Sequence, residues 1–188
     1  MINVFRTIQI AWGDLRISNI NCTNNKCMSS SSISSTISGS LGRCNFSTFR
    51  ENYQPGHYSL EFTQDQVDHN IIISYCNVIE NKCSRYLFRS IYTVNIHHCI
   101  FKNNTADCMF SNKNNFEGKN STVTISDSYI DSNTTWGATV IFTKLIENYD
   151  FNNFIHFYTE NCFIGEKVRV KLSDGLNVVF RRASNRRR

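Results

Sequence analysis

A spaced pattern of apolar, small and asparagine residues recurs along the chain and restricts its fold more than any other feature. The clearest internal match is NCTNNKC at residues 21–27 with NVIENKC at residues 77–83. The wider pattern has four positions. It begins with an apolar residue, which is followed by a small residue three positions later and a second apolar residue two positions after that. An asparagine follows three positions after the second apolar residue. Four copies contain the asparagine: Ile17, Ile20, Cys22 and Asn25; Ile73, Cys76, Val78 and Asn81; Ile96, Cys99, Phe101 and Asn104; and Ile125, Ser128, Ile130 and Asn133. Two partial copies lack it: Leu41, Cys44 and Phe46; and Thr159, Cys162 and Ile164.

The segments around these copies alternate between apolar and polar residues, as at residues 94–96 (VNI) and 123–125 (VTI). Such alternation is typical of β-strands, and no segment carries the 3.6-residue apolar stripe of an amphipathic helix over three turns. The copies begin 23 to 34 residues apart. Repeats of this length indicate a solenoid, so the sequence predicts an all-β fold, a single-stranded parallel β-helix of about five or six irregular coils. Residues 168–180 would form a capping hairpin or one more coil.

In such a helix each position of the register acquires a physical role. The apolar residues would face inward on two strands, and the small residue between them would occupy a tight inward corner. Asparagine would occupy a turn, because its side chain tolerates left-handed backbone better than most. Equivalent residues stack along the axis, and stacked amides can form hydrogen bonds with one another. The predicted structural ladder consists of Asn25, Asn81, Asn104 and Asn133, together with Cys44, Cys76, Cys99 and Cys162.

Two segments resemble a known group of repeats. IHHCIFKNN (residues 96–104) and ISDSYIDSN (residues 125–133) are similar to the right-handed parallel β-helix repeats of the pectin-lyase-like superfamily. They also resemble the Asn- and Cys-rich repeats of surface proteins from parasitic protists and the repeats of polymorphic outer-membrane proteins. The resemblance covers about residues 15–165 and implies right-handed winding and a cell-surface or secreted location. We predict a β-helix domain over residues 1–172, followed by a terminal strand or cap and an Arg-rich tail over residues 173–188.

The charge of the chain is concentrated at its C-terminus. The formal net charge is +5, and residues 181–188 (RRASNRRR) contain five arginines and no acid, so the body is neutral. A neutral body argues against nucleic-acid binding by the folded part. The tail would bind an anionic surface or nucleic acid, act as an import signal, or simply be solvated. No signal peptide or transmembrane segment is predicted. The sequence alone thus indicates an intracellular protein, unless it is a segment of a longer surface protein.

Eight cysteines leave three interpretations open. They are Cys22, Cys27, Cys44, Cys76, Cys83, Cys99, Cys108 and Cys162. Buried free thiols are favoured, because several of the cysteines share the inward corner of the register. Stacked neighbours would also lie within the Cα separation of a disulfide. A structural zinc site has little support, because the chain contains no Cys-x-x-Cys pair. No cofactor is predicted.

Catalytic candidates are few. His97 and His98 precede Cys99, but neighbouring residues of a strand point to opposite faces, so an outward polar surface is favoured over a Cys/His nucleophile. Asp127 and Asp131 are the best candidates for a carboxylate site, with Asp107 stacked one coil below. These acids do not recur at one register position.

Aromatic residues either fill the core or form an outward, carbohydrate-binding row, and core filling is favoured. They include Phe46, Phe49, Tyr53, Tyr58, Phe62, Tyr86 and Phe88. We therefore predict a non-catalytic structural or adhesive module that binds a protein or glycan partner. The alternatives are a polysaccharide-active β-helix enzyme, either a lyase or a glycosidase, and a truncated fragment of a larger surface protein.

Overall fold

The structure, a computed structural model, describes residues 6–11, 13–27, 30–37, 41–55, 58–64, 70–91, 93–112, 122–137 and 139–147. These residues form nineteen β-strands and no helix. All strand pairs among them are parallel. The predicted parallel β-helix is therefore confirmed.

The strands stack into three main sheets. Sheet A contains β1 (Arg6–Ala11), β4 (Ser30–Ile37), β8 (Tyr58–Gln64), β12 (Tyr86–Ser90), β15 (Cys108–Asn112) and β18 (Thr135–Gly137). Sheet B contains β2 (Leu15–Ser18), β5 (Leu41–Asn45), β9 (Asn70–Ser74), β13 (Val94–His97), β16 (Thr122–Ser126) and β19 (Thr139–Thr143). Sheet C contains β3 (Asn21–Thr23), β6 (Thr48–Arg50), β10 (Asn77–Ile79), β14 (Ile100–Lys102) and β17 (Tyr129–Ile130). The short strands β7 (Tyr53–Gln54) and β11 (Lys82–Cys83) pair beside them.

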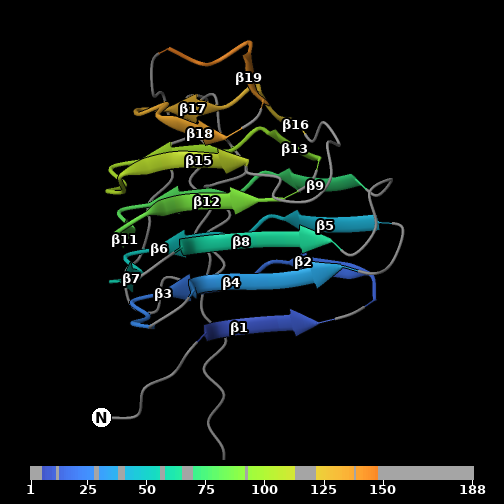
Figure 1. Cartoon of the computed structure of the whole chain (residues 1–188), viewed down its shortest axis with the longest axis vertical. Coiled ribbons are helices and arrows are strands. Elements are labelled where there is room, and N and C mark those ends of the chain that lie inside the picture. The colour runs from blue at the N-terminus through green and yellow to red at the C-terminus, as the bar shows by residue number, and fades with distance from the viewer. Residues whose placement is uncertain are drawn as a thin grey trace, which may run out of the picture.

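The chain passes through sheets A, B and C in turn and then enters the next coil. Figure 1 shows the strands of sheet A crossing the front from left to right, each above the one before, while the chain returns behind them. This winding is right-handed, as parallel crossover connections nearly always are.

One residue lies in the left-handed backbone region at the corner after every sheet B strand, and another at the corner after each sheet C strand except β17. Between sheets B and C these residues have φ of 47–58°, and after sheet C they have φ of 54–56°. None of them is glycine, so each corner places an ordinary side chain on the outside of the turn. The first set is Asn19, Phe46, Tyr75, His98, Asp127 and Lys144, and the second is Asn24, Glu51, Glu80 and Asn103.

Inward side chains stack into apolar columns that fill the helix. In sheet B, Ile71, Val94 and Val123 are opposite one another, and all three are fully buried. Parallel columns contain Ile73, Ile96 and Ile125, and in sheet A the aromatic rings of Phe88 and Phe110. Strands about 4.8 Å apart bring these side chains into contact, and removing their surface from water is the main force that stabilises the solenoid.

The strand pairing corrects one predicted alignment. Cys44 pairs with Ile17 and Ile73, so it occupies the inward strand position and not the corner. Ser47 takes the corner, and Phe49 pairs with Cys22 and Val78. The predicted alignment of Leu41, Cys44 and Phe46 was therefore wrong by three residues. Both registers fit the order of apolar, small and apolar residues, and only Asn52 distinguishes them.

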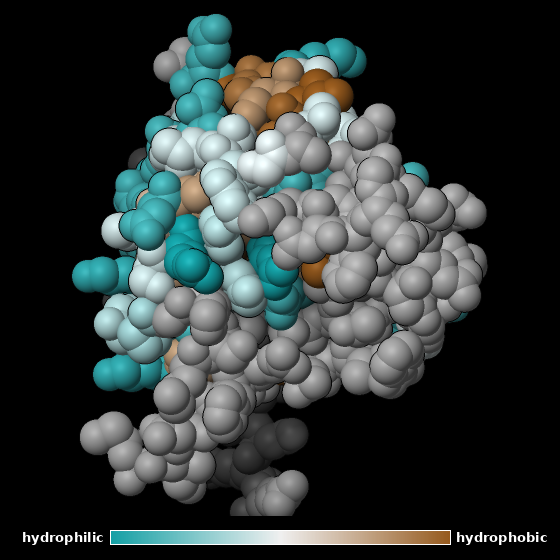
Figure 2. Space-filling view, viewed as in Figure 1, coloured by the Kyte–Doolittle hydropathy of each residue, from teal (hydrophilic) through white to brown (hydrophobic). Residues whose placement is uncertain are grey.

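The last described strands form an apolar surface at one end of the β-helix. Figure 2 shows hydrophobic residues gathered at the upper end of the molecule, where Figure 1 places β17 and β19. Ile141 of β19 has 42% of its surface exposed. The part of the chain that the structure describes contains no helix long and apolar enough to cross a membrane. The predictions for Thr159, Cys162, Ile164, the hairpin at 168–180 and the tail at 173–188 lie outside the described residues.

Candidate functional site

A ladder of four asparagines occupies the turn after sheet C, inside the helix. The side-chain oxygen of Asn52 accepts hydrogen bonds from the backbone nitrogen and Nδ2 of Asn25, at 3.0 and 2.9 Å. The same pair of bonds joins Asn52 to Asn81 and Asn81 to Asn104, all at 3.0 Å. In addition, Nδ2 of Asn52, Asn81 and Asn104 each donates to a backbone carbonyl at 2.8 Å.

Three of the four asparagines predicted for this ladder are thus brought together, and the fourth is not. Among the described residues the ladder ends at Asn104, and Asn133 is exposed. Asn52 is the fourth member of the ladder, and the predicted alignment of the second copy does not include it. Because the amides of Asn52 and Asn81 are occupied by these bonds, they stabilise the turns and are not available to a ligand.

In four successive coils, the corner between sheets B and C holds a small side chain that can both donate and accept a hydrogen bond, whereas the first and last described coils have Ile20 and Leu145 there. These four small residues donate to the carbonyl two positions earlier, at 2.7–3.3 Å. Some also accept from the backbone nitrogen of the corner in the coil before, as Cys99 and Ser128 do at 3.4 and 3.0 Å. Serine and cysteine meet this requirement, whereas a larger polar side chain would not fit the buried corner. The donating residues are Ser47, Cys76, Cys99 and Ser128.

The seven described cysteines are all buried thiols that form no disulfide. Burial raises the pKa of Cys22 to about 11 and that of Cys83 to about 12. Burial likewise raises the pKa of Cys99 well above its usual value, and a hydrogen bond with Cys76 does the same for Cys44. A thiol must ionise to act as a nucleophile or metal ligand. The described residues also contain no group of three or more histidine, cysteine or acidic side chains that could hold a metal.

The histidine pair lies on the outside of the corner. The two Nδ1 atoms of His97 and His98 are 3.0 Å apart, and His98 stacks on Tyr75 with ring centroids 5.0 Å apart. Burial, and then the neighbouring His98, lowers the pKa of His97. The thiol of Cys99 donates to backbone carbonyls, including that of His97. This arrangement is structural and does not form a Cys/His nucleophile.

The candidate carboxylates occupy different positions in the coil. Asp127 lies at the first corner and Asp131 at the opposite end of β17. The carboxylate of Asp131 accepts a hydrogen bond from the backbone nitrogen of Asn103. Asp107 precedes β15, in sheet A. The three acids therefore lie at three different places in the coil, and Asp131 already binds the backbone of the preceding coil.

The aromatic residues divide between the core and the surface. Phe49, Phe62 and Phe88 are buried, as expected for core residues. Phe46 is 48% exposed and stacks on Tyr75, with ring centroids 5.1 Å apart and planes 6° apart. This ring pair and His98 form what we term the corner column. Among the seven aromatics considered in the sequence, Tyr53 is also exposed and Tyr58 and Tyr86 are half-buried.

A second outward stack, which we term the sheet A column, consists of Tyr58, Tyr86 and Trp136. The centroids of Tyr58 and Tyr86 are 5.8 Å apart, and those of Tyr86 and Trp136 are 5.3 Å apart, with planes within 20°. Tyr86 pairs with Cys108 in the intervening strand β15. Trp136 pairs with Ser111, three residues further along β15, so its ring and that of Tyr86 come together diagonally across that strand. Trp136 is 43% exposed.

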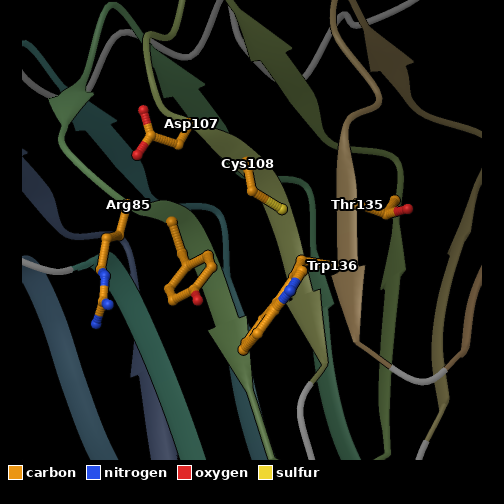
Figure 3. Close-up of a pocket in the computed structure, with 6 residues that line it drawn as sticks. Arg85, Asp107, Cys108, Thr135 and Trp136 are labelled. Carbon is orange, nitrogen blue, oxygen red and sulfur yellow. The ribbon is translucent and has the colours of Figure 1, made fainter.

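A hollow of about 280 Å³ lies beside this column. Figure 3 shows the side chains that line it, with Arg85 and Asp107 extending away from each other. Arg85, Asp107 and Trp136 are all exposed. The repeat pattern does not predict this hollow, because neither Trp136 nor Arg85 belongs to the repeat register. The full lining is Arg85, Tyr86, Asp107, Cys108, Thr135 and Trp136.

Comparison of the chain with protein-family models, with curated proteins and with solved structures finds no match. What the molecule binds is therefore inferred from the geometry of its own residues.

Proposed function

We propose that this protein is a non-catalytic β-helix module that binds a glycan. The observation that supports this function is the presence of two outward aromatic columns on a rigid solenoid, the corner column and the sheet A column. Stacked rings present apolar surface with little conformational freedom, and polar side chains beside them can fix the orientation of a ligand. A glycan chain offers both kinds of surface along its length.

The alternative of a polysaccharide-active enzyme is less well supported. Such chemistry needs an acid and a base held at a defined separation across one bond of the substrate. The candidates Asp127 and Asp131 lie at opposite ends of a strand, and Asp131 is engaged with the backbone of Asn103. The fold alone does not decide between binding and catalysis, so the side chains carry this argument.

We further propose that the chain is related to the right-handed β-helix repeats of the pectin-lyase-like superfamily and acts in adhesion at a cell surface. The repeat pattern and the parallel stacking of its strands support this relation. A surface location agrees with a glycan partner, since glycans are abundant there.

The test is to apply the full chain to a panel of neutral and acidic oligosaccharides and to measure binding and turnover separately. Binding without release of new reducing ends or of unsaturated products is the expected outcome. Depolymerisation by the native chain, abolished in an Asp127→Asn or Asp131→Asn variant, would establish the enzyme instead. A chain that binds no member of the panel would refute the glycan function.

A further inference from the structure

The hollow beside the sheet A column combines an exposed aromatic ring with charged side chains of both signs. Trp136 supplies the aromatic surface, and Arg85 and Asp107 supply the charges. The buried Cys108 lies between them and has a pKa raised by burial, so it supplies neither charge nor nucleophile. The ligand of this hollow must therefore offer an apolar face and several hydroxyl or amide groups.

The size of the hollow limits the ligand to a small ring. Its volume of about 280 Å³ is close to the lower end of the range of about 300–1,000 Å³ for pockets that hold drug-sized ligands. It therefore admits one sugar ring, and the rest of a longer glycan would extend over the surface.

The aromatic surface is held in place before any ligand binds. Nη1 of Arg89 lies 2.9 Å from the Tyr58 hydroxyl and 2.8 Å from the carboxylate of Glu61. The guanidinium also lies over the ring of Tyr58, 4.6 Å from its centroid. Tyr58 supports Tyr86, which in turn supports Trp136. A surface that is already ordered costs little entropy when it binds.

The charges favour a neutral polyol. Arg85 can only donate hydrogen bonds and the carboxylate of Asp107 can only accept them, whereas a hydroxyl group does both. One positive and one negative side chain leave the rim without a preference for an anion or a cation. The C–H groups of a pyranose carry a small positive charge, which the negative face of an aromatic ring attracts.

We infer that this hollow is a subsite for one neutral pyranose ring of a glycan. The C–H face of the ring packs on the indole of Trp136, and its hydroxyls bond with Asp107 and Arg85. This inference rests on the proposed glycan function and assigns the sugar to the sheet A column, and not to the corner column.

The experiment is a ligand-observed NMR titration of the full chain with cellohexaose, mannohexaose, xylohexaose and hexagalacturonate. At least one of the neutral hexasaccharides should bind with a Kd on the order of 1 mM, as expected for a shallow site that holds one ring. Trp136→Ala should raise this Kd by about tenfold or more, and Asp107→Asn by about threefold. Trp136→Phe should retain part of the affinity, because it keeps an aromatic face.

Tyr53→Ala is the matched control, since Tyr53 is an exposed ring that belongs to neither column. Its Kd should remain within about twofold of the native value. Binding that survives Trp136→Ala but is lost in Phe46→Ala, in the corner column, would overturn the subsite and leave the glycan function standing. Failure of the native chain to bind any hexasaccharide would overturn both. Tighter binding of hexagalacturonate than of every neutral sugar would refute the neutral ligand. If Trp136→Ala failed to fold, the Asp107→Asn and Trp136→Phe titrations would still decide the question.

Discussion

Replacing Asn81 with alanine should destabilise the β-helix more than any surface substitution, because Asn81 lies in the middle of the asparagine ladder. Its side-chain oxygen accepts two hydrogen bonds from Asn52, and its Nδ2 donates to the carbonyl of Phe49 and to Oδ1 of Asn104. Asn81 is 1% exposed, so water does not reach these groups in the native chain.

The expected loss follows from these four bonds. A typical bond contributes about 0.5–1.5 kcal/mol net, and a buried polar group left without a partner costs about 1–3 kcal/mol. Asn104 keeps a bond from the Asn81 backbone nitrogen, and Nδ2 of Asn52 keeps its bond to the Cys22 carbonyl. The backbone nitrogen of Asn52 loses its acceptor, which is Oδ1 of Asn81. We therefore expect Asn81→Ala to lower the free energy of unfolding by about 3–5 kcal/mol, a large part of the stability of an ordinary domain.

Urea unfolding followed by circular dichroism measures this loss, with the native chain and the variant compared at one temperature and pH. Asn95→Ala is the matched control. It removes the same side chain from a single exposed bond, between Asn95 Nδ2 and Asn70 Oδ1 at 3.3 Å. Repeat proteins can unfold in stages, so hydrogen exchange at neighbouring coils should accompany the urea data.

A loss from Asn81→Ala no larger than that from Asn95→Ala would contradict a stabilising role for the ladder. A loss of less than about 1 kcal/mol would mean that the ladder only fills space, and that water replaces its hydrogen bonds at little cost.

Three further predictions concern titratable groups. Cys99→Ser should lower the free energy of unfolding by less than about 1.5 kcal/mol, because serine occupies the same corner in other coils. Cys99→Asp should lower it by several kcal/mol, because it buries an unpaired carboxylate. Urea unfolding compares the two variants, and equal midpoints would contradict the inward placement of Cys99. Cys22 and Cys83 should resist iodoacetamide at pH 8 until the chain is unfolded, which mass spectrometry detects. Because burial raises their pKa values in the folded state, the stability that these thiols contribute is present below their ordinary pKa of 9.0 and decreases as pH rises toward about 11–12; urea midpoints that stay constant across this range would argue against it. The pKa of His97 is lowered by burial and by His98, so the unfolded chain binds its proton more tightly and stability should decrease as pH falls below about 6.5. His97→Gln should flatten this dependence, measured by thermal unfolding from pH 5 to pH 8.

The fold could be predicted from the sequence because the inside of a β-helix repeats. Ile73, Ile96 and Ile125 lie opposite one another in sheet B, and the three share one position of the sequence register. Asn81 and Asn104 bond to each other for the same reason. A residue that must fit a fixed position in every coil leaves a periodic signal, even where the loops differ in length.

The error in the second copy shows where this signal becomes ambiguous. Cys44 is small and apolar, so it suits either the corner or the inward strand position. The sequence pattern placed it at the corner, and the strand pairing places it opposite Ile17. Ser47 and Cys44 could both form the hydrogen bond of the corner, so the asparagine that follows, Asn52, is what distinguishes the two registers.

The sheet A column could not be predicted in this way. Tyr86 and Trp136 belong to strands separated by β15 and pair with different residues of it, Cys108 and Ser111, so their rings meet diagonally across that strand. Neither the spacing nor the composition of these residues repeats. The position of each depends on the length of the segment that precedes its strand, and those lengths vary from coil to coil.

The inward positions of the repeat and the outward positions of sheet A therefore have different roles, so one set can be substituted without changing the role of the other. The side-chain amide of Asn81 is fully hydrogen-bonded within the ladder, so a substitution there changes stability and does not affect ligand binding. Trp136 contributes exposed surface at the edge of a hollow, so a substitution there changes recognition at little cost to folding. If both substitutions behave in this way, the outward positions of sheet A determine what the solenoid binds, and the inward register determines only that it folds.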